Sequence, residues 1–240
     1  MMSLSNGRIR EVVFQSETLK EELTILIYVP AYYSPMNKYP VLIVNDGKDY
    51  FQLGRLPRYM DSLIDENEID PAIVVGIPYK NVKDRRNKYH PAGAEHESYR
   101  QFLVNELIPW IDDEYSTITV ASGRTIVGDS LAATVSLLTA IEFPHTFGQV
   151  ILHSPYVNDD VLDRLQHSNQ LTHLNVYHVV GKEEDLVLVS DIKDFLTPNR
   201  RLHQLFKQKG FSTFYDEFQG GHSWKFWQPD LKRALLYMLS

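Results

Sequence analysis

Short apolar runs alternate with longer amphipathic segments from about residue 39 to the end of the chain. Continuous apolar runs of this length are typical of strands buried on both faces of a sheet. Their alternation with helix-length segments predicts an α/β fold with a mostly parallel central sheet and helices on both faces. The buried strands are expected at residues 40–44, 72–76, 125–127, 150–152, 176–180 and 213–218.

Two further strand-like stretches precede this alternation, at residues 11–14 and 23–29. Only a short polar turn separates them, which favours an antiparallel pair. We expect this pair to form one edge of the sheet.

Prolines and glycines mark several helix ends. Pro57 can open a helix with one apolar face, and Thr197 followed by Pro198 predicts an N-cap and first residue of another. That second helix should end before Gly210. Pro229 is expected to open the last helix.

The remaining segments complete a single domain over residues 1–240, because no linker or internal repeat divides the chain. Residues 97–115 predict a helix that Pro109 kinks. The polar stretch 81–95 is the longest connection, and together with the segment 154–172 it is expected to shape a pocket.

Composition narrows the classes of function. The 43% hydrophobic and 23% charged residues are typical of a globular protein. Without cysteine, the chain has no disulfide, thiolate metal site or cysteine nucleophile. The formal net charge of −7 disfavours binding to nucleic acid or anionic membranes.

The chain lacks a run of about 20 apolar residues and its start lacks the apolar core of a secretory signal. We therefore expect a cytoplasmic protein that binds neither membranes nor nucleic acid. The oligomeric state stays open, with a homodimer as one option.

Residues 124–142 pass from a β-branched run through small residues directly into an apolar helical segment. A nucleophile elbow needs this passage, with small residues two positions before and after a serine, because strand and helix converge there. Gly128 and Ala132 occupy these positions around Ser130. We therefore interpret Ser130 as a nucleophile; the alternative is a serine that only caps the helix.

A serine nucleophile needs a base, and His222 follows two glycines after the last predicted strand. This loop is where the histidine of a Ser–His–acid triad is expected. The pairs His90/His96 and His173/His178 lack the spacing of an HExxH zinc motif. We predict no metal site and no cofactor.

The acid of such a triad should follow a strand that lies between the serine and the histidine. Three carboxylates, Glu183, Glu184 and Asp185, follow the strand predicted at residues 176–180. We choose Glu184, with Asp185 and Glu183 as alternatives. The ordinary role of charges in such a loop is solvated surface.

An oxyanion hole needs two N–H donors. The N–H of Leu131 is one candidate, because it directly follows the serine and begins a helix. The N–H of Lys48 is the second, since it follows a glycine turn at the end of an apolar strand. An ordinary Asp-Gly turn is the alternative there.

Five side chains are candidates for substrate contacts. The aromatic residues Tyr156, Trp224 and Trp227 suggest an apolar or ring-bearing group near the site. Arg85 and Arg86 lie in the long connection, where they would meet an anionic group. The alternative is a solvated pair of arginines.

The chain resembles the "putative esterase" family of α/β hydrolases in five segments that follow in order: the strand ending in Asp46-Gly47, DRRNKYHPAG, the elbow GDSLAA, GKEED and GGHSWKFWQPDL. That family includes enterochelin esterases, S-formylglutathione hydrolase, feruloyl esterases and mycolyl transferases. The resemblance implies an α/β-hydrolase fold and a serine hydrolase with Ser130 as nucleophile, His222 as base and Glu184 as acid. Ala132 replaces the usual second glycine of the elbow.

The letters GDSL also name a different esterase family, in which the motif lies near the N-terminus and an aspartate precedes the histidine by three. Here Gln219 holds that position. We predict a serine carboxylic ester hydrolase that acts on a small or medium ester through an acyl-enzyme. An acyltransferase using the same residues and a catalytically silent binding protein with this fold are the alternatives.

Overall fold

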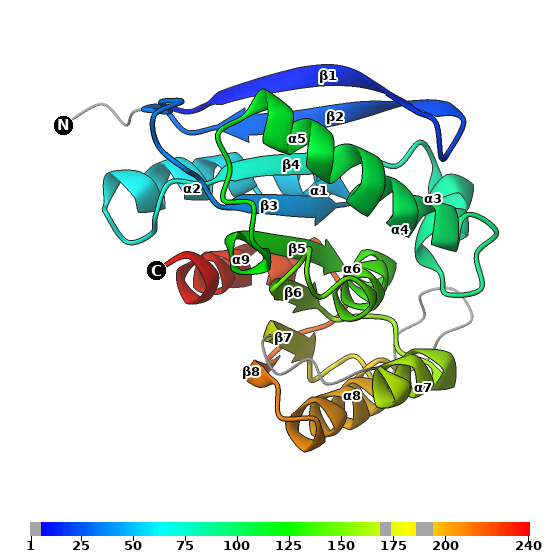
Figure 1. Ribbon diagram of the computed structural model, residues 1–240. Coiled ribbons are helices and arrows are strands. Elements are labelled where there is room, and N and C mark those ends of the chain that lie inside the picture. Colours follow the sequence, from blue (N-terminus) through cyan, green and yellow to red (C-terminus); the bar gives the residue numbers. More distant parts are fainter. Residues whose placement is uncertain (1–5, 169–173, 186–193) are drawn as a thin grey trace.

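A computed structural model describes residues 6–168, 174–185 and 194–240 of the chain (Figure 1). Its centre is an eight-stranded sheet with the order β1-β2-β4-β3-β5-β6-β7-β8. The strands are β1 Arg8–Ser16, β2 Glu21–Val29, β3 Val41–Asn45, β4 Ile73–Ile77, β5 Arg124–Asp129, β6 Gln149–His153, β7 Asn175–Gly181 and β8 Ser212–Phe218.

The strand directions agree with those expected from the sequence. β1 pairs antiparallel with β2, and β2 pairs antiparallel with β4, while all pairs from β4 to β8 are parallel. The prediction of a mostly parallel sheet with an antiparallel N-terminal edge is confirmed. The carboxyl ends of β3 to β8 consequently meet at one edge of the sheet.

Helices cover both faces of the sheet (Figure 1). They are α1 Gly47–Gln52, α2 Leu56–Asp65, α3 Val82–Tyr89, α4 His96–Phe102, α5 Ile108–Glu114, α6 Leu131–Glu142, α7 Asp159–His167, α8 Leu196–Gln208 and α9 Trp224–Leu239. A π-helical turn, Leu103–Leu107, joins α4 to α5, and a 3₁₀ turn, Ala121–Gly123, precedes β5.

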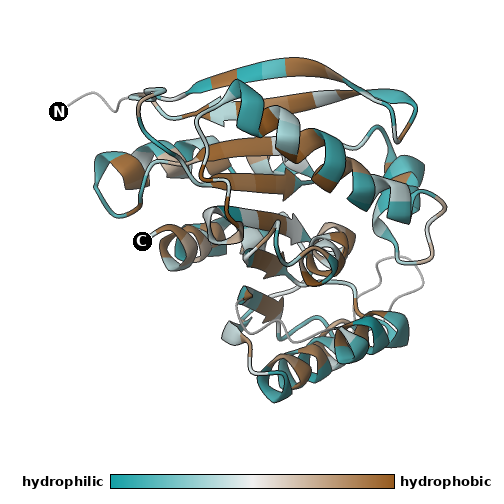
Figure 2. Cartoon of the chain, in the orientation of Figure 1, coloured by the Kyte–Doolittle hydropathy of each residue, from teal (hydrophilic) through white to brown (hydrophobic). Residues whose placement is uncertain are grey.

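Alternating residues of each central strand divide the interior into two cores. Val41 and Ile43 of β3 belong to a core that includes residues of α4 to α8. Leu42 and Val44 face the other way, into a core with residues of α1, α2 and α9. Both sets are buried, which explains why β3 reads as a continuous apolar run, and Figure 2 shows the central strands as the most apolar part of the chain.

Two predicted helix starts are wrong. Thr197 lies inside the first turn of α8, and its N–H donates to Asp194 Oδ1 at 3.0 Å, so Asp194 supplies the capping oxygen. The last helix begins at Trp224, five residues before Pro229. The missing N–H of Pro229 leaves only the carbonyl of the exposed Lys225 without its helical partner, where water can replace it.

Two connections contain more structure than expected. Residues 82–89 of the predicted long connection form α3, and residues 159–167 form α7. Residues 169–172 of the segment 154–172 lie outside the described residues. The expected interruption near Pro109 takes the form of the π-helical turn, which precedes this proline at the start of α5.

Within the described residues, no helix combines the length and the apolar character needed to cross a bilayer.

Candidate active site

Ser130 lies in a sharp turn between β5 and α6, with φ +52° and ψ −123°. A residue other than glycine is strained in such a conformation. The strand and the helix approach closely here: a Cβ added to Gly128 would lie 2.3 Å from the backbone carbonyl of Ala132. The turn is held by the N–H of Ser130, which donates to the carbonyl of His153 at 2.9 Å.

His222, in the loop between β8 and α9, lies between the serine and a carboxylate. Its Nε2 is 2.9 Å from Ser130 Oγ, and its Nδ1 is 2.7 Å from Glu184 Oε2. The imidazole packs between two aromatic rings, with centroid distances of 4.1 Å to Phe195 and 4.8 Å to Trp227. Three groups that are distant in sequence thus form one continuous hydrogen-bonded chain.

Burial distinguishes Glu184 from the other carboxylates of its loop. Its side chain is fully buried, whereas Glu183 and Asp185 are exposed. Its Oε1 accepts hydrogen bonds from the Ser154 hydroxyl at 2.6 Å and from the N–H of Gly181 at 2.8 Å. With His222 on Oε2, the carboxylate has three hydrogen-bonding partners, which fix its orientation.

Trp227 is connected to the Glu184 carboxylate through Ser154. Its side chain is only 4% exposed, and its indole Nε1 donates to Ser154 Oγ at 3.0 Å. Ser154 therefore links Trp227 to Glu184, a role that the sequence analysis missed. The available signal was its position directly after β6, at the same sheet edge as Ser130.

The two expected oxyanion donors lie at neighbouring helix starts. Leu131 is the first residue of α6, and Lys48 is the second residue of α1, which follows β3. Because β3 and β5 are adjacent parallel strands, both helices begin at the same edge of the sheet. Amides in the first turn of a helix have no carbonyl partner within that helix, so they are suited to bind an anion.

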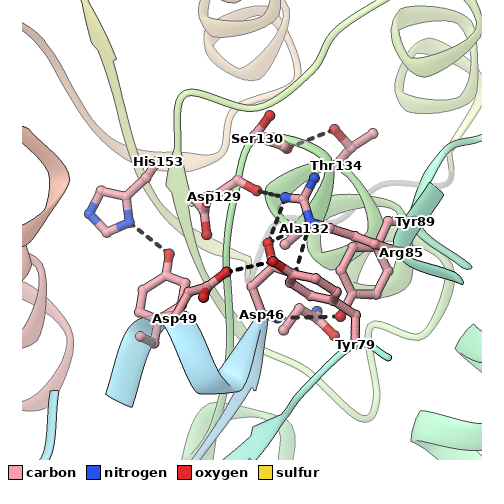
Figure 3. Close-up of polar contacts among 12 residues, drawn as sticks. Asp46, Asp49, Tyr79, Arg85, Tyr89, Asp129, Ser130, Ala132, Thr134 and His153 are labelled. Carbon is pink, nitrogen blue, oxygen red and sulfur yellow. Dashed lines mark hydrogen bonds and ion pairs between the residues drawn. The ribbon is translucent and has the colours of Figure 1, made fainter. Parts of the chain in front are cut away.

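Arg85 is directed toward the sheet, whereas its neighbour Arg86 is exposed. The Arg85 guanidinium forms an ion pair with the buried Asp46, at the end of β3, and also contacts the backbone carbonyl of Asp129 (Figure 3). Asp46 and Asp129 are further residues of this region that the sequence analysis did not single out. Acidic residues at the ends of two adjacent buried strands were the signal.

The two remaining aromatic candidates, Tyr156 and Trp224, contact different parts of the fold. The backbone N–H of Tyr156 donates to the carbonyl of Ser130 at 3.2 Å, and its half-buried ring lies 5.2 Å from the ring of His90. The ring of Trp224 packs edge-on against Tyr50 of α1 at 4.7 Å.

The described residues contain no group of three or more His, Asp or Glu side chains arranged to hold a metal ion. Of the histidines compared above, His173 lies outside the described residues. His178 and His96 are buried, and burial lowers the pKa of His178 to about 3 and that of His96 to about 4.

Comparisons with known proteins agree with the architecture. The protein YjcH of Bacillus subtilis (strain 168) is 46% identical over 240 residues, covering 99% of this chain and 100% of that protein. A ferulic acid esterase structure superposes with a TM-score of 0.81 at 18% identity, covering 98% of each chain. The enterobactin esterase of Shigella flexneri, crystallised in the presence of enterobactin, has a TM-score of 0.82 at 20% identity, covering 96% of this chain and 58% of that one.

The match to a protein family spans nearly the whole chain. Residues 16–238 match the family described as "Putative esterase", a range that runs from the end of β1 into the last turn of α9. The eight-stranded sheet and its helices have the α/β-hydrolase arrangement of the esterase structures. The chain therefore belongs to this esterase family of α/β hydrolases and is a carboxylic ester hydrolase.

Proposed function

We propose that the protein hydrolyses small or medium carboxylic esters through an acyl-enzyme on Ser130, with His222 as general base and Glu184 as the carboxylate of the triad, which orients the imidazole. The observation that carries this proposal is the hydrogen-bonded chain from Ser130 Oγ through His222 to the buried Glu184 carboxylate. A carboxylate at Nδ1 favours the tautomer in which Nε2 is free to accept the serine proton.

In the first half of the reaction, Ser130 Oγ attacks the ester carbonyl carbon while its proton moves to His222 Nε2. The carbonyl oxygen becomes an oxyanion, which the N–H groups of Leu131 and Lys48 stabilise. The bond to the alcohol oxygen then breaks, and the alcohol leaves with the proton from His222. The acyl group remains as an ester of Ser130.

In the second half, water attacks the acyl carbon and gives a proton to His222 Nε2. The bond between the acyl carbon and Ser130 Oγ breaks, the proton returns to Oγ, and the carboxylic acid is released. Glu184 remains ionised throughout, because it stabilises the imidazolium rather than accepting its proton.

A fluorophosphonate probe tests this proposal directly. Ser130 Oγ should displace fluoride from phosphorus and form a stable phosphonyl ester, which intact mass spectrometry and peptide mapping detect. Ser130→Ala should abolish labelling and lower kcat by about 10⁶-fold, as losing the nucleophile does in serine proteases. Labelling at another residue, or a Ser130→Ala variant with a tenth of the original kcat, would contradict the proposal.

Substrate class is tested with p-nitrophenyl esters of increasing acyl length beside aromatic esters, which the names of the ferulic acid and enterobactin esterases suggest. Hydrolysis of the shorter acyl esters is expected. Measuring the products with and without an added alcohol separates hydrolysis from acyl transfer, because only transfer forms a new ester.

A further inference from the structure

One arginine bonds to both strand ends that precede the proposed oxyanion donors. Arg85 Nε donates to Asp46 Oδ1 at 3.0 Å and to Oδ2 at 2.8 Å, and its Nη2 donates to Oδ2 at 2.5 Å. The same Nη2 lies 3.3 Å from the backbone carbonyl of Asp129, as Figure 3 shows. Asp46 precedes Lys48 by two residues, and Asp129 precedes Leu131 by two.

The Asp46 ion pair is enclosed. Asp46 is 1% exposed, and the rings of Tyr79 and Tyr89 lie 5.8 Å and 5.7 Å from the centre of the guanidinium. The Asp46 N–H also contacts the Tyr89 hydroxyl at 3.3 Å. Backbone and side chain of Asp46 are therefore both held, and a buried carboxylate requires such a partner.

A second carboxylate lies beside this pair. Asp129 is 4% exposed, and its Oδ1 has no hydrogen-bond partner within the described residues. Burial, followed by the charge of Asp46, raises the pKa of Asp129 well above its usual range. Arg85 thus forms an ion pair with Asp46, whereas only the backbone carbonyl of Asp129 accepts a hydrogen bond from the guanidinium.

The two proposed donors belong to separate elements. Lys48 is on α1, whose Tyr50 is buried in one core, and Leu131 is on α6, whose buried residues belong to the core on the other face of the sheet. A developing oxyanion needs both N–H groups within about 2.7–3.1 Å. No single helix fixes the distance between them.

Resting on the proposed function, we propose that Arg85 is a positioning residue that sets the separation of the Lys48 and Leu131 amides by joining Asp46 to the carbonyl of Asp129. The planar guanidinium suits this role, because its fixed fork reaches two acceptors at once. The lysine ammonium keeps the charge but has no such fork.

The test is Arg85→Lys, assayed with a p-nitrophenyl ester that the wild-type protein hydrolyses. We expect kcat to fall about 10- to 100-fold, since small misplacements of catalytic groups cost this much, with KM within about two-fold. The affinity for a trifluoromethyl ketone analogue of the ester, which forms an oxyanion on Ser130, should fall by the same factor as kcat/KM. Asp46→Asn keeps the side-chain size and should reduce kcat in the same way.

Arg124→Lys is the matched control, because the buried Arg124, at the opposite end of β5, forms an ion pair with the half-buried Asp112 of α5. It should lower Tm without changing kcat or the inhibitor affinity. If a folded Arg85→Lys or Asp46→Asn variant behaves in the same way, the positioning role is wrong although the proposed function stands. Failure of the wild-type protein to react with fluorophosphonate at Ser130 would instead overturn the proposed function.

Discussion

Glu184 contrasts with its neighbours Glu183 and Asp185 in its surroundings rather than in its chemistry. All three side chains carry a carboxylate, but only Glu184 is buried and bonded to His222. Turn geometry brings it inward, with the Glu184 N–H donating to the Gly181 carbonyl at 3.2 Å and Gly181 donating back to the carboxylate at 2.8 Å. This local hydrogen-bonded turn places Glu184, and not Glu183 or Asp185, inside the protein.

Glu184→Gln should lower kcat by about 10³- to 10⁴-fold, since an amide in this place favours the wrong imidazole tautomer. Asp185→Asn is the control and should retain wild-type kcat. Steady-state kinetics of both variants, with circular dichroism to check folding, decide the assignment. If only Asp185→Asn lost activity, Asp185 rather than Glu184 would be the acid of the triad.

At the scale of single residues, the sequence pointed to Ser130 and His222 through local context. It left Glu183 and Asp185 as alternatives to Glu184, because the buried position of Glu184 depends on Ser154, 30 residues away in sequence, as well as on the local turn with Gly181. The link from Trp227 to Ser154 spans 73 residues. Such contacts leave no local pattern, so the sequence predicts a substrate contact for Trp227 but not its hydrogen bond to Ser154.

The turn from β5 to α6 depends on the small size of residue 128, which is a glycine. The 2.3 Å approach to Ala132 leaves no room for a Cβ at Gly128. Since the obstacle is backbone of a buried helix, it has little freedom to move.

Gly128→Ala should therefore lower the free energy of unfolding by about 1–3 kcal/mol and reduce kcat, because the elbow must shift. Gly210→Ala is the matched control: φ there is +75°, but nothing lies within 4 Å of an added Cβ. It should cost about 1 kcal/mol of stability with unchanged kcat. Chemical unfolding and steady-state assays measure both quantities, and equal kcat in the two variants would contradict the argument.

Element types were predictable where one physical signal dominated. The buried parallel strands appeared as apolar runs because both faces contact a core. The starts of α8 and α9 were not predictable from proline alone, since Asp194 caps the first and the second extends through Pro229. The helix α3 was missed because its polar residues show little apolar periodicity.

On the scale of the whole molecule, buried neutral histidines link stability to pH. Burial gives His178 a pKa of about 3 and His96 a pKa of about 4, below the value near 6.5 of an unfolded chain. As pH falls below 6.5, the unfolded state binds protons that the folded state does not bind. The stability contributed by each neutral histidine is therefore present above pH 6.5 and is lost as pH falls toward its folded pKa.

Between pH 6.5 and pH 5, the free energy of unfolding should decrease by up to about 2 kcal/mol for each of these histidines. Urea unfolding at several pH values measures the decrease. His178→Gln removes the titrating group and leaves an amide near the Asn199 oxygen, which His178 Nε2 contacts at 2.7 Å. The variant should show a smaller decrease than the wild type, and identical slopes would show that His178 does not contribute.

The crowding at Gly128 also has an evolutionary consequence. Replacing the Ser130 hydroxyl removes a reactive group but leaves the backbone path intact, whereas any side chain at Gly128 collides with the adjoining helix. In a lineage that lost catalysis but stayed folded, we expect Ser130 to be replaced first and Gly128 to be retained. In distant descendants that have lost catalytic activity, this glycine would still be present, because the turn requires it.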